Sequence, residues 1–127
     1  MPKPRVLIAD DEEGVRESLN LILSDDCDLT FASNGEETLA HLKRQPFSLV
    51  LLDIKMPKLD GMAVLRRLSP KLRKTPILML TAYQSVELAK EAVKLGALDY
   101  LPKPFEREQI LSTVRSVLAQ RSPGFIR

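Results

Sequence analysis

The sequence predicts an α/β domain in which helices cover both faces of a parallel sheet. Five short apolar runs alternate along the chain with stretches that have the 3.6-residue periodicity of helices. The first, third and fourth runs are apolar throughout, which is typical of strands buried on both faces. We therefore expect five βα units in one doubly wound sheet with right-handed crossovers.

The elements follow one another in a regular order. The expected strands are 6–9, 29–32, 49–52, 77–80 and 100–101. The residues that mark one face of each intervening helix are Val15, Leu19, Ile22 and Leu23; Leu39 and Leu42; Val64, Leu65 and Leu68; and Ile110, Val114, Val117 and Leu118. The remaining helix, between the fourth and fifth strands, is expected from a cap at Ser85 to Leu95, with Gly96 ending it. The second helix is expected to begin at Ser33 or Asn34, with Glu36 or Glu37 completing a capping box.

The bulk properties suit one globular domain. The chain has 127 residues, 44% hydrophobic and 28% charged, and no apolar run approaches the roughly 18–20 residues of a membrane span. The basic start is followed by too short an apolar run for a signal peptide, so we expect a cytoplasmic protein. The single cysteine, Cys27, cannot form a disulfide within the chain. The net charge of +2 and the basic stretch 66–74, which contains no aromatic residue, favour a solvated surface over nucleic-acid binding.

Polar residues stand at four of the expected strand ends. Asp10 and Asp11 follow the first strand, Asp53 the third and Thr81 the fourth, and Lys103 follows the fifth. Because the carboxyl ends of parallel strands meet at one edge, these groups should converge there. Clustered carboxylates repel unless a cation joins them, and oxygen ligands suit Mg²⁺. Taken together, the groups predict a phosphoryl site in which a carboxylate can be the nucleophile.

Each of these residues also has an ordinary interpretation. Asp10 and Asp11 can cap a helix, and Asp53 can close a turn. Thr81 can be a plain strand residue, and Lys103 can face solvent. The hypothesis of a site depends on their occurring in order at successive strand ends. His41 lies within an expected helix and offers no competing metal ligand, and no glycine-rich nucleotide-binding motif is present.

Four motifs give the sequence a specific resemblance. VLIADDEE (6–13), LVLLDIKMPKLDGMAVL (49–65), PILMLTAY (76–83) and GALDYLPKPF (96–105) occur in this order. In this respect the chain resembles the receiver domain of two-component response regulators. The resemblance, and not the hydrophobic pattern, implies the flavodoxin-like strand order 2-1-3-4-5, which a member of that family is known to adopt. It also implies a receiver domain over residues 4–119, followed by a tail or the start of a linker at 120–127.

The same resemblance implies a role for each matched residue. Asp53 resembles the phosphoacceptor, and Asp10, Asp11, Asp53 and the backbone carbonyl of Lys55 resemble the Mg²⁺ ligands. Lys103 should pair with the phosphoryl oxygens, Thr81 should bond them after transfer, and Tyr100 matches an aromatic switch position. The Lys103–Pro104 bond should be cis. Lys55 and Tyr83 flank the site and are bulky, and we hypothesise that they slow hydrolysis of the acyl phosphate.

The implied function is a signalling switch. A sensor histidine kinase or phosphotransfer protein would phosphorylate Asp53, which would alter the 85–119 face toward an output domain or partner. A phosphorylation-dependent homodimer is compatible with this function, whereas membrane contact, nucleic-acid binding by this domain and turnover of an external substrate are not expected. Two alternatives differ in class: a phosphatase of haloacid-dehalogenase type, which would need a D-x-D motif on the first strand, and a phosphorylation-independent interaction module.

Overall fold

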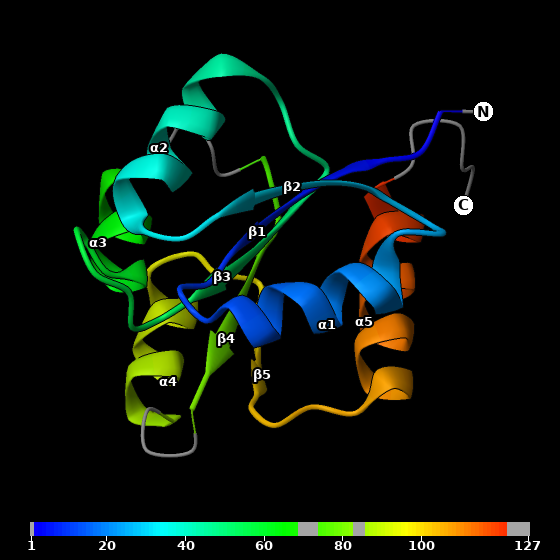
Figure 1. The fold of residues 1–127 in the computed structure, drawn as a ribbon. Helices are drawn as coiled ribbons and strands as arrows, with labels where there is room; N and C mark the ends of the chain where they lie inside the picture. Colours follow the sequence, from blue (N-terminus) through cyan, green and yellow to red (C-terminus); the bar gives the residue numbers. More distant parts are fainter. Residues whose placement is uncertain (1, 69–73, 83–85, 122–127) are drawn as a thin grey trace.

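The computed structural model describes residues 2–68, 74–82 and 86–121, and it confirms the predicted α/β architecture (Figure 1). Within these described ranges, five strands and five helices alternate. They are β1 (Arg5–Ala9), α1 (Glu13–Leu23), β2 (Asp28–Ala32), α2 (Gly35–Arg44), β3 (Leu49–Asp53), α3 (Gly61–Arg67), β4 (Ile77–Thr81), α4 (Val86–Lys94), β5 (Asp99–Pro102) and α5 (Arg107–Arg121). All strand pairs are parallel, in the order β2-β1-β3-β4-β5.

The sheet separates two apolar layers. Side chains of β1, β3 and β4 alternate between the two faces, so that Leu7, Val50 and Met79 point to one side and Ile8, Leu51 and Leu78 to the other. Helices α2, α3 and α4 cover the first face, and α1 and α5 cover the second (Figure 1). Both faces of the three central strands are therefore buried, which accounts for their uninterrupted apolar sequence.

Several expected boundaries differ from those observed. Every strand is longer by one or two residues than its apolar run: β1 begins at Arg5 and β2 at Asp28, β3 ends at Asp53 and β4 at Thr81, and β5 extends at both ends. Hydrophobicity could not reveal these ends, because the added residues pair through their backbones. The cap expected at Ser85 lies outside the described residues.

Both Ser33 and Asn34, the two residues predicted as alternative starts of α2, take part in its cap. Asn34 is the N-cap, and its side chain accepts the backbone N–H of Glu37 at 2.8 Å. The Glu37 carboxylate reaches back to the N–H of Ser33 at 2.7 Å and to its hydroxyl at 3.0 Å. The reciprocal bonds of a capping box are therefore present, although the return bond goes to the residue before the cap.

The loop between β3 and α3 is held tightly against the sheet. The Gly61 N–H donates to the Ile54 carbonyl at 2.7 Å, and a side chain at Gly61 would overlap the Asp53 carbonyl. Lys58 and Leu59 have positive φ values of 50° and 91°, which non-glycine residues seldom adopt. The loop thus turns sharply away from the end of β3, with glycine required at its closest approach.

Candidate functional site

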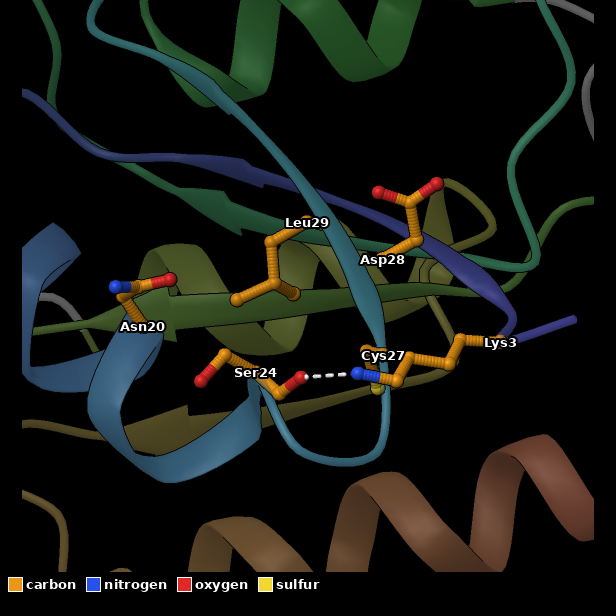
Figure 2. A pocket seen from close by; sticks show the side chains of 6 residues that line it. All are labelled: Lys3, Asn20, Ser24, Cys27, Asp28 and Leu29. Carbon is orange, nitrogen blue, oxygen red and sulfur yellow. Dashed lines mark hydrogen bonds between the residues drawn. The ribbon is translucent and has the colours of Figure 1, made fainter.

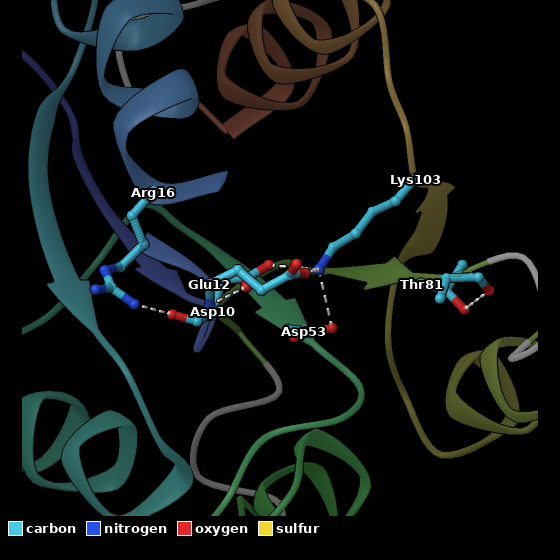
Figure 3. Close-up of polar contacts among 7 residues, drawn as sticks. Asp10, Glu12, Arg16, Asp53, Thr81 and Lys103 are labelled. Carbon is cyan, nitrogen blue, oxygen red and sulfur yellow. Dashed lines mark hydrogen bonds and ion pairs between the residues drawn. The ribbon is translucent and has the colours of Figure 1, made fainter. Parts of the chain in front are cut away.

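The carboxyl ends of four strands meet at one edge of the sheet, as the sequence predicts. Asp10 follows β1, Asp53 ends β3, Thr81 ends β4 and Lys103 follows β5. Strand order reverses beside β1, where β2 and β3 lie on opposite sides of it, and such points form ligand crevices in doubly wound sheets. Figure 3 shows the side chains of Asp10, Asp53 and Lys103 pointing toward one another, with Thr81 at the end of β4.

Lys103 is the centre of this group. Its Nζ lies 2.7 Å from Oδ2 of Asp10, 3.2 Å from Oε1 of Glu12 and 3.4 Å from Oδ1 of Asp53 (Figure 3). Only 14% of its side chain is exposed. Burial acts to lower the pKa of Lys103, but the neighbouring carboxylates outweigh it and raise that pKa. The ammonium group is therefore held charged. Lys103 points into the site and does not face solvent, as the ordinary interpretation would have it.

Asp10 and Asp53 are buried carboxyl groups that one lysine cannot fully compensate. Burial is the main cause that raises the pKa of Asp10 above its usual value. Burial and then the charge of Asp10 raise the pKa of Asp53 to about 7. Without a further cation, the site favours keeping a proton on Asp53 near neutral pH.

The two carboxylate oxygens of Asp10 have different partners. Its Oδ1 accepts the N–H of Glu12 at 2.9 Å. Its Oδ2 is buried, forms an ion pair with the Lys103 ammonium group at 2.7 Å and has no other polar partner among the described residues. Carboxylate oxygens of Asp10, Asp11 and Glu12 lie within 4.8 Å of one another, with Asp10 buried and the other two exposed. This set of carboxylate oxygens, one buried and two exposed, carries more negative charge than Lys103 can neutralise and fits a hard divalent cation such as Mg²⁺.

The gathered carboxylates differ in one respect from the predicted ligand set. Asp10 and Asp11 are present as expected, but the third carboxylate near them is Glu12, for which the sequence predicts no role. Asp53 joins the group through Lys103. Glu12 is also the N-cap of α1, without a side-chain capping bond, so Asp10 and Asp11 do not cap that helix. Lys55 is exposed and lines, with Asp11, a hollow of about 510 Å³ beside the site.

The predicted switch residues lie in neighbouring strands, Thr81 at the end of β4 and Tyr100 within β5. Thr81 is fully buried, and its hydroxyl donates to the Ala82 carbonyl at 3.0 Å. Tyr100 is partly buried against the core on the α4 side of the sheet. The Lys103–Pro104 bond is cis, as expected. Tyr83 lies outside the described residues, so its expected position beside the site stays a prediction.

A second hollow lies around the end of α1 and the start of β2. Six residues line it: Lys3, Asn20, Ser24, Cys27, Asp28 and Leu29 (Figure 2). Lys3 donates to the Ser24 carbonyl at 3.0 Å. Burial raises the pKa of the Cys27 thiol to about 11, which leaves it protonated and unreactive. This hollow therefore adds no reactive group to the site.

Known proteins resemble this chain in sequence and in fold. FixJ, a transcriptional regulatory protein of Bradyrhizobium diazoefficiens, is 36% identical over 123 residues, which cover 96% of this chain and 60% of FixJ. The response regulator MprA of Mycobacterium leprae is 40% identical over 94% of this chain and 53% of MprA. The chain thus spans about half the length of the curated relatives it matches.

Solved structures of response regulators also resemble this chain in fold. The receiver domain of the Francisella response regulator 1452 superimposes with a TM-score of 0.86 and 30% identity, over 94% of this chain and all of that one. Among the described residues, no helix is both long and apolar enough to cross a bilayer. The family model of the response regulator receiver domain matches residues 6–115. With its five parallel βα units and its acidic edge, the chain belongs to the response regulator receiver domain family.

Proposed function

We propose that this domain is a phosphorylation-activated switch in which Asp53 accepts the phosphoryl group. The observation that carries the proposal is the buried carboxylate of Asp53 at the end of β3, 3.4 Å from the charged Lys103 and beside the acidic residues Asp10 to Glu12. A carboxylate, a fixed cation and a metal-binding cluster are the parts that phosphoryl transfer to an acid requires.

In the transfer, an Oδ atom of Asp53 attacks phosphorus in line with the leaving group. For a phosphohistidine donor on a kinase or phosphotransfer protein, the P–N bond breaks and its electron pair returns to the imidazole. Lys103 lies where its charge can neutralise the phosphoryl oxygens. Asp10 and Asp11, with Asp53 and the Lys55 carbonyl, would hold Mg²⁺, which supplies further neutralisation of the transferring group.

The raised pKa of Asp53 gives the cation a second role. At a pKa of about 7, much of Asp53 is protonated near neutrality and cannot attack. A cation near Asp10 and Asp53 favours their charged forms. The proposal therefore includes a requirement for a divalent cation before transfer, in addition to charge neutralisation during it.

The phosphorylated site would act on the 85–119 face. The product adds nearly two negative charges and new acceptor oxygens beside Lys103 and Thr81. Within the described part of the chain, the buried Thr81 hydroxyl donates to the neighbouring Ala82 carbonyl, so it can be redirected to a new acceptor. Tyr100 lies in the strand next to Thr81 and would couple this change to the face built from α4, β5 and α5. We propose an output domain, a partner protein or a second phosphorylated copy as its ligand.

The test is direct phosphorylation. The protein is incubated with Mg²⁺ and a small acyl phosphate, and intact-mass and peptide measurements locate the added group. We expect a base-labile phosphoryl addition at Asp53 that is absent in Asp53→Asn and retained in Asp25→Asn, an exposed carboxylate outside the site. An unmodified wild type, or equal modification of Asp53→Asn, would refute the proposal. Continuous turnover of a phosphate ester would instead favour the phosphatase.

A further inference from the structure

Arg16 of α1 reaches back to the loop that carries the acidic residues. Its Nη1 donates to the main-chain carbonyl of Asp10 at 2.7 Å (Figure 3). The side chain is partly buried and lines a shallow hollow of about 300 Å³ beside Phe31 of β2. This bond links α1 to the residue at which the chain leaves β1.

The Arg16 bond completes a set of three anchors on Asp10. The main-chain N–H of Asp10 donates to the Ala32 carbonyl of β2 at 3.0 Å, one residue beyond the end of β1. Its side-chain Oδ1 accepts the Glu12 N–H at 2.9 Å. The main-chain carbonyl is held by Arg16. Sheet, loop and helix thus each fix a different polar group of Asp10, and the remaining one, Oδ2, has only its ion pair with Lys103 among the residues that the structure describes.

We propose that Arg16 is a positioning residue of the cation site. By fixing the carbonyl of Asp10, it sets the orientation of the peptide plane that joins Asp10 to Asp11, and with it the position of Asp11 and of the Glu12 N–H that holds Oδ1 of Asp10. A change in this plane would shift Asp11 relative to Asp10 and weaken the Glu12 bond that orients the Asp10 carboxylate. The inference rests on the proposed function, because it concerns the Mg²⁺ that this function requires. Outer residues that orient ligands commonly affect metal affinity by about 10–100-fold.

The direction in which Mg²⁺ affinity changes when Arg16 is replaced distinguishes a positioning role from a purely electrostatic one. Arg16 carries a positive charge that lies 2.7 Å from the Asp10 carbonyl, and it follows the acidic residues Asp11, Glu12 and Glu13 in the sequence. Removal of that charge alone would make the potential more negative and tighten the binding of a cation. Positioning predicts the opposite result, because the carboxylates would lose their shared geometry.

The experiment measures Mg²⁺ affinity by calorimetry with no phosphodonor present. We expect Arg16→Met to bind Mg²⁺ about 10-fold more weakly than wild type. Arg16→Lys, which keeps a donor and the charge, should recover affinity to within about 3-fold. Arg67→Met, with the same loss of charge on the exposed surface of α3, should be unchanged. In metal-free protein, the Glu12 amide should exchange its hydrogen faster in Arg16→Met than in wild type.

Phosphorylation then distinguishes this inference from the proposed function. With excess Mg²⁺, Arg16→Met should regain the wild-type rate, because Asp53 and Lys103 are intact. Equal or tighter Mg²⁺ binding by a folded Arg16→Met would overturn the inference and leave the proposed function standing. If Arg16→Met does not fold, Arg16→Gln, which is too short to keep the bond, takes its place with the same expectations. A wild type that neither binds Mg²⁺ nor becomes phosphorylated would refute both.

Discussion

Replacement of Asp53 by asparagine should make the metal-free protein less sensitive to pH. Burial and the charge of Asp10 raise the pKa of Asp53 to about 7 from its ordinary value of 3.8. Between these two values the folded protein keeps a proton that the unfolded chain releases. Stability is therefore lost as the pH rises through this window, and the loss is complete above the folded pKa. Asparagine carries no charge at any pH and removes this loss.

The size of the effect follows from the pKa difference. Each pKa unit corresponds to about 1.4 kcal/mol, so Asp53 costs the metal-free protein about 4 kcal/mol above the window. Between about pH 5 and about pH 8, wild type should lose about 2–3 kcal/mol relative to Asp53→Asn. Because the free energies of unfolding are compared at two pH values, any pH-independent difference in the packing of aspartate and asparagine cancels.

Urea unfolding in the presence of a chelator provides the measurement. The free energy of unfolding falls by about 1–3 kcal/mol per molar urea. The unfolding midpoint of wild type should therefore fall, relative to that of Asp53→Asn, by about 1–2 M between the lower and the higher pH. Asp25→Asn, an exposed control, should follow wild type. Mg²⁺ at the higher pH should stabilise wild type more than Asp53→Asn. Parallel curves for wild type and Asp53→Asn across this pH range would show that Asp53 is not a perturbed group and would refute the reasoning.

Three further substitutions test the loop after β3, the cap of α2 and the ion pairs of Lys103. Gly61→Ala should destabilise the protein by about 1–3 kcal/mol in thermal unfolding, because its Cβ would overlap the Asp53 carbonyl; the same change at Gly14, where the added carbon meets nothing within 4 Å, should not destabilise it. Asn34→Ala should cost about 1 kcal/mol in urea unfolding through loss of the α2 cap, and no loss would contradict that role. Lys103→Met should lower the free energy of unfolding of the metal-free protein in urea by about 3–5 kcal/mol above neutral pH, and by less in acid, where the facing carboxyl groups are protonated. An equal loss at both pH values would contradict the ion pairing.

The order of elements could be predicted well from the sequence because hydrophobic periodicity reports burial directly. The three central strands have continuous apolar runs, and the structure buries both of their faces. The convergence of Asp10, Asp53 and Lys103 followed from parallel topology alone, since residues that end parallel strands share an edge.

The features that the sequence did not predict depend on local backbone geometry. Glu12 reaches Lys103 because the chain turns directly after Asp10, and an acidic residue in that position is equally typical of the first turn of a helix. Arg16 acts through a main-chain carbonyl, and such a contact leaves no mark on residue patterning. The positive φ of Leu59 is likewise invisible, because glycine and asparagine are the usual signals for that conformation.

The arrangement around Lys103 explains how a small covalent change could affect a distant face. Three carboxylates share one ammonium group, at distances of 2.7, 3.2 and 3.4 Å, so its position reflects a balance among them. Phosphorylation would place nearly two charges at Asp53, whose carboxylate is now the most distant of the three, and would draw Lys103 toward it. Lys103 also donates its backbone N–H to the Thr81 carbonyl at 2.7 Å, which ties the start of the β5–α5 loop to the end of β4. Movement of this lysine would therefore affect the same two strands that carry Thr81 and Tyr100, and the site and its proposed output face would respond together.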